Sequence, residues 1–153
     1  FKSLDREPSL EETALLLGRP YTIRGRVVSG QRRGHSLGFP TLNLEPENEV
    51  LPQAGVYACR VRFLDAGTPP AGKLHDAVTN VGRRPTFGDL ERALPEAHLL
   101  DFSADVYGRR AEIAFIEHLR AEQRFESVDA LRDQIARDAA AARARLSGTR
   151  EPR

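Results

Sequence analysis

Residues 55–63, Gly-Val-Tyr-Ala-Cys-Arg-Val-Arg-Phe, decide the class of fold. Tyr57, Cys59, Val61 and Phe63 recur at every second position of this stretch. Successive side chains of a β-strand point to opposite faces of the sheet, so this period predicts a strand with one face in a core.

The same period of two recurs along the chain. In residues 21–27, Tyr, Ile, Gly and Val alternate with polar side chains, and residues 39–44, 74–80 and 97–102 are further strand candidates. In residues 111–119 we expect Ala111, Ile113, Phe115 and Leu119 on one face, opposite Glu112 and His118. Five or six strands joined by loops, with no helix between them, predict a mainly β antiparallel barrel rather than a parallel sheet.

Helices are expected only near the two ends of the chain. Ser9 and Glu12 form a capping-box pattern, which predicts a short helix over residues 10–17. Near the other end, apolar residues at helical spacing follow Ser127, a good N-cap, and precede Gly148, a good helix stop. We expect this stripe to pack on the barrel, and it consists of Val128, Leu131, Ile135, Ala139, Ala142 and Leu146.

The composition is that of a folded protein without a large charge excess. Of 153 residues, 40% are hydrophobic and 29% charged, and 23 Lys and Arg stand against 22 Asp and Glu. Non-specific nucleic-acid binding draws on a strong positive excess, so no nucleic-acid partner is expected. One cysteine excludes an internal disulfide framework, and four dispersed histidines do not make a zinc site.

The sequence also bears on location and organisation. No apolar run approaches the roughly 18 residues of a membrane span and no signal-peptide pattern is present, so we expect a cytoplasmic protein without a membrane partner. The chain begins with Phe1 and contains no Met, which predicts a fragment or a processed chain. We expect residues 1–18 to form an N-terminal helical linker segment and residues 19–153 to form one domain.

Residues 29–38 form a glycine-rich loop with three positively charged or titratable side chains, Arg32, Arg33 and His35. The glycine spacing differs from that of a P-loop, and the P-loop lysine is missing. Backbone N–H groups of such a loop can still bind a polyphosphate. A solvated hairpin loop is the alternative interpretation.

Two pairs of polar residues could carry chemistry. Thr41 and Asn43 are two residues apart, so in an extended segment their oxygens could meet a hard cation such as Mg²⁺. Two neutral oxygens bind Mg²⁺ poorly unless phosphate oxygens complete its octahedron, and a polar strand start is the alternative.

Glu96 and His98 also share a face, and a carboxylate there could accept a proton from a substrate hydroxyl. Periodicity does not say which face of this strand is the core, and a surface glutamate is the alternative.

Two loops could border a ligand. Residues 80–87 are polar and contain Gly and Pro, which suits the rim of a cleft or a plain surface connection. Arg120 and Phe125 offer a cation and an aromatic ring to a planar ligand, although Phe125 could instead be a hydrophobic staple before the last helix.

Taken in order, these segments resemble the riboflavin kinase family, including the form at the C-terminal end of bacterial bifunctional FAD synthetases. The resemblance spans roughly residues 19–146 and is carried by residues 34–44 (Gly-His-Ser-Leu-Gly-Phe-Pro-Thr-Leu-Asn-Leu) and 96–102 (Glu-Ala-His-Leu-Leu-Asp-Phe). It implies a six-stranded Greek-key barrel with a C-terminal α-helix. It also implies transfer of the ATP γ-phosphate to the riboflavin 5′-hydroxyl, giving FMN and ADP.

The resemblance further implies roles for individual residues. Thr41 and Asn43 would hold Mg²⁺ with the nucleotide phosphates, and Glu96 would be the general base. The implied ATP-binding residues are Gly30, Gly34, His35, Pro40, Asn80, Gly82 and Pro85, and the implied flavin-binding residues are Tyr107, Arg120 and Phe125. An N-terminal adenylyltransferase domain is a possible partner in a full-length protein.

Three residues depart from the family pattern. His35 stands where Arg or Lys is usual, Leu42 where Ala is usual, and Pro95 precedes Glu96; none of these changes removes a catalytic group. A different interpretation keeps the barrel without catalysis, as a module that binds nucleotide or single-stranded RNA. ATP consumption that depends on riboflavin would separate the two.

Overall fold

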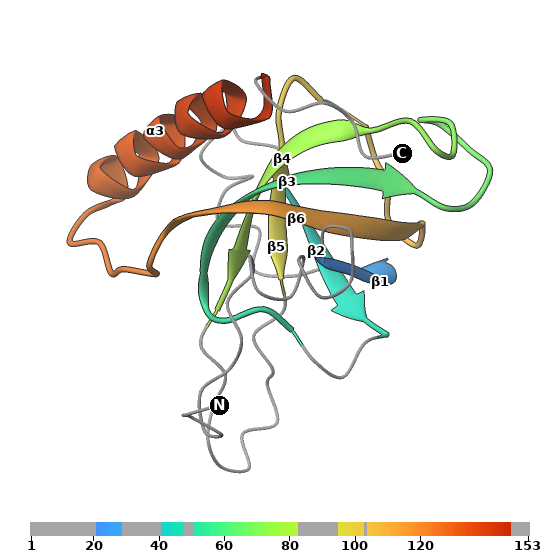
Figure 1. The fold of residues 1–153 in the computed structure, drawn as a ribbon, viewed down its shortest axis with the longest axis horizontal. Coiled ribbons are helices and arrows are strands. Elements are labelled where there is room, and N and C mark those ends of the chain that lie inside the picture. Colours follow the sequence, from blue (N-terminus) through green and yellow to red (C-terminus); the bar gives the residue numbers. More distant parts are fainter. Residues whose placement is uncertain (1–20, 29–40, 48–50, 83–94, 103, 148–153) are drawn as a thin grey trace, which may run out of the picture.

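The computed structural model describes residues 21–28, 41–47, 51–82, 95–102 and 104–147. Within them the chain order is β1 (Tyr21–Val28), β2 (Thr41–Pro46), β3 (Gly55–Phe63), β4 (His75–Val81), β5 (Glu96–Leu99), β6 (Arg110–Arg120) and α3 (Val128–Ser147), as Figure 1 shows. The expected helix over residues 10–17, the expected boundary at residue 18 and the expected helix stop at Gly148 lie outside these ranges.

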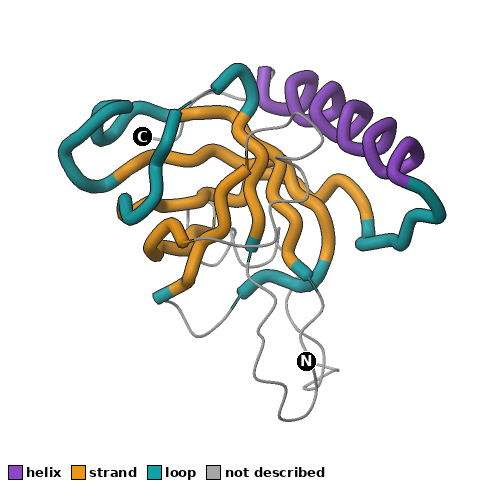
Figure 2. The backbone as a smooth tube through the Cα atoms, turned by 180° about the vertical axis from the view of Figure 1, so that it is seen from behind, coloured by secondary structure: helices purple, strands orange, loops and turns teal. Residues whose placement is uncertain are grey.

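The strands close into one barrel in the order β1, β2, β5, β4, β3, β6, and every neighbouring pair is antiparallel. β3, β4 and β5 are consecutive neighbours, and β6 returns to pair with β3. This order is that of a Greek key. The predicted mainly β, six-stranded antiparallel barrel with a C-terminal helix is therefore confirmed (Figure 2).

The barrel interior is filled by the apolar face that the alternation predicts. Tyr57, Cys59, Val61 and Phe63 of β3 all lie in this core, together with Ile23 and Val27 of β1. At one point two strands approach closely: a Cβ on Gly25 would meet the backbone carbonyl of Glu45, so only glycine fits there. Further core residues are Leu42, Leu44, Ala77, Val81, Ala97, Leu99, Val106, Ala111, Ile113 and Phe115.

The predicted faces of residues 111–119 are right in the first half and wrong in the second. Pairing between β3 and β6 shifts register between Val56 and Tyr57 and again between Ala58 and Cys59. Such bulges change which face a side chain takes. Leu119 therefore packs outside the barrel, against a second buried cluster. The ring of His118, in contrast, lies 5.1 Å from that of core residue Tyr57. The second cluster consists of Val56, Ala58, Val78, Ala142 and Leu146.

α3 packs on the outside of the barrel, against β4, β3 and β6. The predicted N-cap is confirmed, since the Ala130 N–H donates to Ser127 Oγ at 3.0 Å. Ile135, Ala142 and Leu146 of the predicted stripe are buried, but Val128 is 59% exposed because it precedes the part of the helix that reaches the barrel. The stripe also contains a residue that periodicity did not predict, the 6% exposed Asp138. No helix among the described residues is long and apolar enough to cross a membrane.

Candidate active site

Strand pairing brings the predicted chemistry-bearing residues into one row. Asn43 of β2 is the register partner of Glu96 of β5, and Glu96 is also the partner of Asn80 of β4. One step along the same face, Thr41 pairs with His98. Register partners in a sheet share a face, so these side chains are neighbours. The Glu96 row, as we call Asn43, Glu96 and Asn80, joins residues far apart in sequence.

The site lies on the outer surface of the barrel. Leu42 and Leu44 alternate with Thr41 and Asn43 and are buried in the barrel core, as are Ala97 and Leu99 beside Glu96. This settles which face of β5 is the core. The bulk that Leu42 adds where the family usually has Ala goes into the core and not into the site.

Several polar atoms of this face are buried without a hydrogen bond. Among the described residues Thr41 Oγ1, Asn80 Oδ1 and His98 Nδ1 have no partner, and Asn43 is only 9% exposed. A buried polar atom without a partner costs free energy, about 1–3 kcal/mol in mutational data. Such atoms require an explanation, and a catalytic role or a bound ion or water is one that fits this face.

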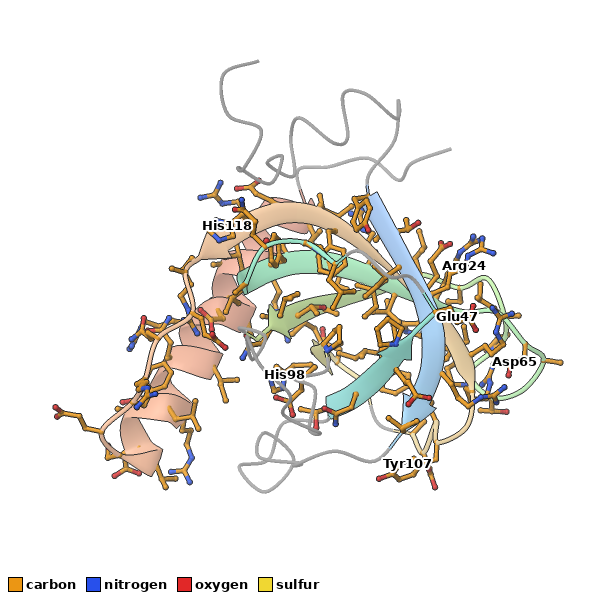
Figure 3. The ribbon with its side chains drawn as sticks, turned by 90° about the horizontal axis from the view of Figure 1, so that it is seen from below. Arg24, Glu47, Asp65, His98, Tyr107 and His118 are labelled. Atoms are coloured by element: carbon orange, nitrogen blue, oxygen red, sulfur yellow. The ribbon has the colours of Figure 1, made fainter. Side chains whose placement is uncertain are left out.

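His98 also belongs to this site, although the sequence analysis assigned it no role of its own. Burial lowers the pKa of His98 to about 4 by disfavouring the charged ring, against the opposing pull of the Asp138 carboxylate on α3. The ring is therefore neutral near pH 7 and can accept as well as donate a hydrogen bond. Figure 3 shows His98 on the side of the barrel that faces α3.

The donor chemistry at Thr41 and Asn43 fits Mg²⁺. Both side chains offer oxygen, the ligand that Mg²⁺ prefers, and Thr41 Oγ1 is buried with no protein partner in the described part of the chain. These residues contain no cluster of three or more His, Cys, Asp or Glu that could hold a metal by itself. Phosphate oxygens and water would have to complete the coordination.

Arg120 closes the row on the other side. Asn80 pairs with Val56 of β3, and Val56 pairs with Arg120 at the end of β6. The Arg120 guanidinium donates through Nε and Nη2 to the two carboxylate oxygens of Asp138, at 2.9 and 2.8 Å. Its centre lies 5.8 Å from the centroid of the Phe125 ring. The structure thus brings Arg120 and Phe125 together.

Comparison with known proteins identifies the family. The family model of riboflavin kinase matches residues 17–146. The chain belongs to the riboflavin kinase family.

Curated relatives agree with this family. The chain is 42% identical over 129 residues to a bifunctional riboflavin kinase/FMN adenylyltransferase of Haemophilus influenzae and 44% identical over 128 residues to one of Escherichia coli K12. Each match covers 84% of this chain, but 40% and 39% of the relative. The chain therefore spans about two fifths of the length of these relatives.

Two solved structures are similar to the barrel. A crystal structure described as a macrolide-efflux protein from Streptococcus pneumoniae has a TM-score of 0.77 at 34% identity, covering 88% of this chain and 42% of that one. Riboflavin kinase from Trypanosoma brucei has a TM-score of 0.55 at 22% identity, covering 84% of this chain and 80% of that one. At that identity the second likeness shows the fold alone.

The third residue that resemblance to the riboflavin kinase family assigns to flavin, Tyr107, is not beside Arg120 and Phe125. It lies in the turn before β6, whereas Arg120 ends that strand. Its backbone N–H donates to Asp105 Oδ1 at 3.1 Å, and the next N–H, that of Gly108, donates to the Val27 carbonyl at 3.0 Å. Tyr107 is 46% exposed, near the end of β1 in Figure 3. This turn bonds to Val27, and the next residue, Val28, is the register partner of Asn43. Tyr107 is therefore placed near the predicted metal ligands and not near Arg120.

The ATP-binding set expected for a riboflavin kinase is described only in part. Asn80 lies in the Glu96 row and Gly82 directly follows β4. Gly30, Gly34, His35, Pro40 and Pro85 lie outside the described residues. The family departure at Pro95 keeps the strand pairing, because the Pro95 carbonyl accepts a hydrogen bond from the Leu44 N–H at 3.0 Å.

Proposed function

We propose that the chain transfers the γ-phosphate of ATP to the 5′-hydroxyl of riboflavin, giving FMN and ADP. The observation that supports this most directly is the outer face on which Thr41 and Asn43 lie next to Glu96, with Asn80 on its other side. Phosphoryl transfer requires positioning, charge neutralisation and at most one base near the attacking oxygen. This face offers a group for each task.

In this proposal Glu96 accepts the proton of the riboflavin 5′-hydroxyl as that oxygen forms a bond to the γ-phosphorus. The bond between the γ-phosphorus and the oxygen of the β-phosphate breaks, and ADP leaves. Thr41 Oγ1 and the Asn43 side chain are the residues that would hold Mg²⁺, which neutralises phosphate charge when bound. Asn80 and His98, with buried atoms that have no partner in the described residues, are placed to hydrogen-bond the nucleotide or the flavin side chain.

The longer organisation is also a proposal. The relatives carry an FMN adenylyltransferase activity in their names, and the chain matches about two fifths of their length. We therefore propose that the chain is the kinase domain of a bifunctional FAD synthetase, with residues 1–18 as the linker to an adenylyltransferase domain. We expect it to act in the cytoplasm, where both substrates are available.

Product analysis tests the function. Purified chain with riboflavin, ATP and Mg²⁺ should form FMN and ADP in equal amounts and no FAD, as separated by liquid chromatography with fluorescence detection. Omission of riboflavin should abolish ADP formation. Formation of FAD, or ATP consumption that does not require riboflavin, would contradict the proposal. Nucleotide binding without any FMN would favour a non-catalytic barrel.

A further inference from the structure

We propose that Asp138 of α3 is a positioning residue for the flavin side of the site, acting through Arg120 on Phe125. The proposal rests on the proposed function, because it takes the segment of residues 121–125 to border bound riboflavin. It assigns a role in ligand binding to a helix residue that the sequence pattern placed nowhere in the site.

The first observation is that α3 buries a carboxylate. Asp138 is only 6% exposed because it lies with Ile135 and Ala142 on the face of α3 that packs against the barrel. Burial of an unpaired carboxylate is unfavourable, so a buried Asp needs charged or hydrogen-bonding partners. Asp138 has them: Arg120 donates two hydrogen bonds and Gln134 Nε2 a third, at 2.9 Å.

The second observation is how this pair fixes Arg120. Two parallel N–H···O bonds hold the guanidinium plane in one orientation, which a single hydrogen bond would not do. Arg120 Nη1 also donates to the Ala121 carbonyl at 3.0 Å, so the same group holds the start of the segment that leaves β6. Asp138 thereby orients the Arg120 side chain, which also binds the backbone of the next residue.

The third observation is what lies against that plane. The Phe125 ring is centred 5.8 Å from the Arg120 guanidinium carbon, within the range of a cation–π contact. Phe125 has no other ring contact in the part of the chain that the structure describes. Arg120 thus contacts the Phe125 ring on one side and is held by Asp138 on the other, so a change at Asp138 can reach Phe125 through Arg120.

The same helix supplies a matched control. Arg143 of α3 donates to both carboxylate oxygens of Asp101 at 3.1 and 3.4 Å, so this second fork also ties α3 to the barrel. Asp101 and Arg143 are both exposed and no residue of the candidate site contacts them through a described hydrogen bond. Asp101→Asn removes an anchor of α3 without touching Arg120, whereas Asp138→Asn removes the anchor that orients it.

The first test is kinetic. We expect Asp138→Asn to raise the KM for riboflavin about tenfold or more while kcat changes less than about threefold, because loss of ground-state binding raises KM alone. Asp101→Asn should leave both within about twofold, and Asp138→Glu should recover part of the affinity. Equal riboflavin KM in Asp138→Asn and Asp101→Asn would overturn the proposal. Failure of the parent chain to phosphorylate riboflavin would instead overturn the proposed function.

The second test does not use activity. The chain contains no Trp, so Phe125→Trp introduces a single fluorescent reporter at the position in question. Adding Asp138→Asn should increase acrylamide quenching of this reporter about twofold or more, since quenching follows exposure of the ring. Adding Asp101→Asn should not. Unchanged quenching with Asp138→Asn would overturn the proposal.

Asp138→Asn leaves a partly buried arginine without its counter-ion, and this variant could lose its fold. Arg120→Lys then serves in both tests, because it keeps the positive charge next to Asp138 but cannot form the planar fork. We expect a higher riboflavin KM and increased quenching of the reporter at position 125. A riboflavin KM and quenching equal to those of the parent would overturn the proposal.

Discussion

Two glutamates on opposite sides of the barrel each have a register partner on both neighbouring strands, but the partners differ in kind. Glu112 of β6 has Arg24 of β1 as its register partner on one side and Arg62 of β3 on the other. Its two carboxylate oxygens each accept a hydrogen bond at 2.8 Å from one of these guanidinium groups. Glu96, in contrast, has an asparagine on each side. We call Arg24, Glu112 and Arg62 the Glu112 row.

The neighbours decide what each carboxylate can do. Burial raises the pKa of Glu112, but hydrogen bonds from Arg62 and Arg24 and their charges outweigh it, so its pKa lies below the usual value. Such a carboxylate is held as an ion pair and is a poor proton acceptor. Asparagine neighbours add no charge, and around Glu96 the buried polar atoms of Thr41, Asn80 and His98 have no partner in the described residues. The Glu112 row joins three strands through ion pairs. For the Glu96 row we propose a role in ligand binding.

The largest expected effect separates the two rows by activity. Glu96→Gln should reduce the single-turnover rate of phosphoryl transfer on the order of 10²–10⁴-fold, because the amide cannot accept the hydroxyl proton. A loose transition state needs less help from a base, which favours the lower end of this range. The rate is measured by rapid quench at saturating ATP and riboflavin.

Glu112→Gln is the matched control for that measurement. It should change the rate less than about threefold, yet lower the free energy of unfolding by about 1–3 kcal/mol, since two arginines lose a charged partner. Chemical denaturation of both variants gives the second number. If the rate of Glu96→Gln matched that of Glu112→Gln, Glu96 would have no part in proton transfer.

The second prediction tests the predicted metal ligands against a threonine on the neighbouring strand, β1, at the end of that strand that pairs with β6. Thr41→Val should lower turnover at limiting Mg²⁺ by about tenfold or more, because it removes one of two protein oxygens offered to the cation. Its free energy of unfolding should stay equal or rise by up to about 1 kcal/mol, since a buried hydroxyl without a partner is lost.

Thr22→Val, on β1 opposite Ala114 of β6, is the control for position. It should not change the dependence of turnover on Mg²⁺. Asn43→Ala should shift that dependence in the same direction as Thr41→Val. Equal magnesium titrations for Thr41→Val, Asn43→Ala and the parent chain would exclude both residues as ligands.

The third prediction concerns stability in acid. The folded-state pKa of His98, about 4, lies below the ordinary value of 6.5, so the unfolded chain binds more protons between these two values. The contribution of His98 to stability is complete above about pH 6.5 and is lost as the pH falls toward 4. The loss is at most about 3 kcal/mol, since one pKa unit corresponds to about 1.4 kcal/mol.

A denaturation series between pH 7 and 4 measures this contribution. His98→Gln should show a shallower loss of stability on acidification than the parent. The same pH dependence in His98→Gln and the parent would show that the buried ring does not titrate in this window.

The smallest effect on stability is expected for an exposed ion pair, that of Arg110 with Glu47. Arg110 donates to both oxygens of Glu47 at 2.8 and 3.2 Å, but both side chains are exposed. Exposed ion pairs contribute little and are screened by salt. Glu47→Gln should lower the thermal unfolding midpoint less than Glu112→Gln, and the difference from the parent should disappear at about 1 M salt. A loss that persists in high salt would contradict this ranking.

Much of the fold followed from local sequence patterns. The period of two located the strands to within a few residues, and helical spacing with Ser127 located α3. The resemblance supplied Thr41, Asn43 and Glu96, and their pairing supports that grouping. Local patterns succeed here because alternation and capping depend only on residues close in sequence.

The tertiary structure alone decided which face of β5 lies outside the barrel and which neighbours each carboxylate received. Alternation gives two faces but does not say which one is inside, so only closure of the barrel placed Glu96 and His98 outside. The bulges between β3 and β6 redirected His118 and Leu119, and no local pattern marked them. Asp138 was missed because its partner, Arg120, is 18 residues away, and it is packing of α3 on the barrel that brings the two together. Strand register and helix packing are non-local, which is why the difference between Glu96 and Glu112 became visible only in the folded chain.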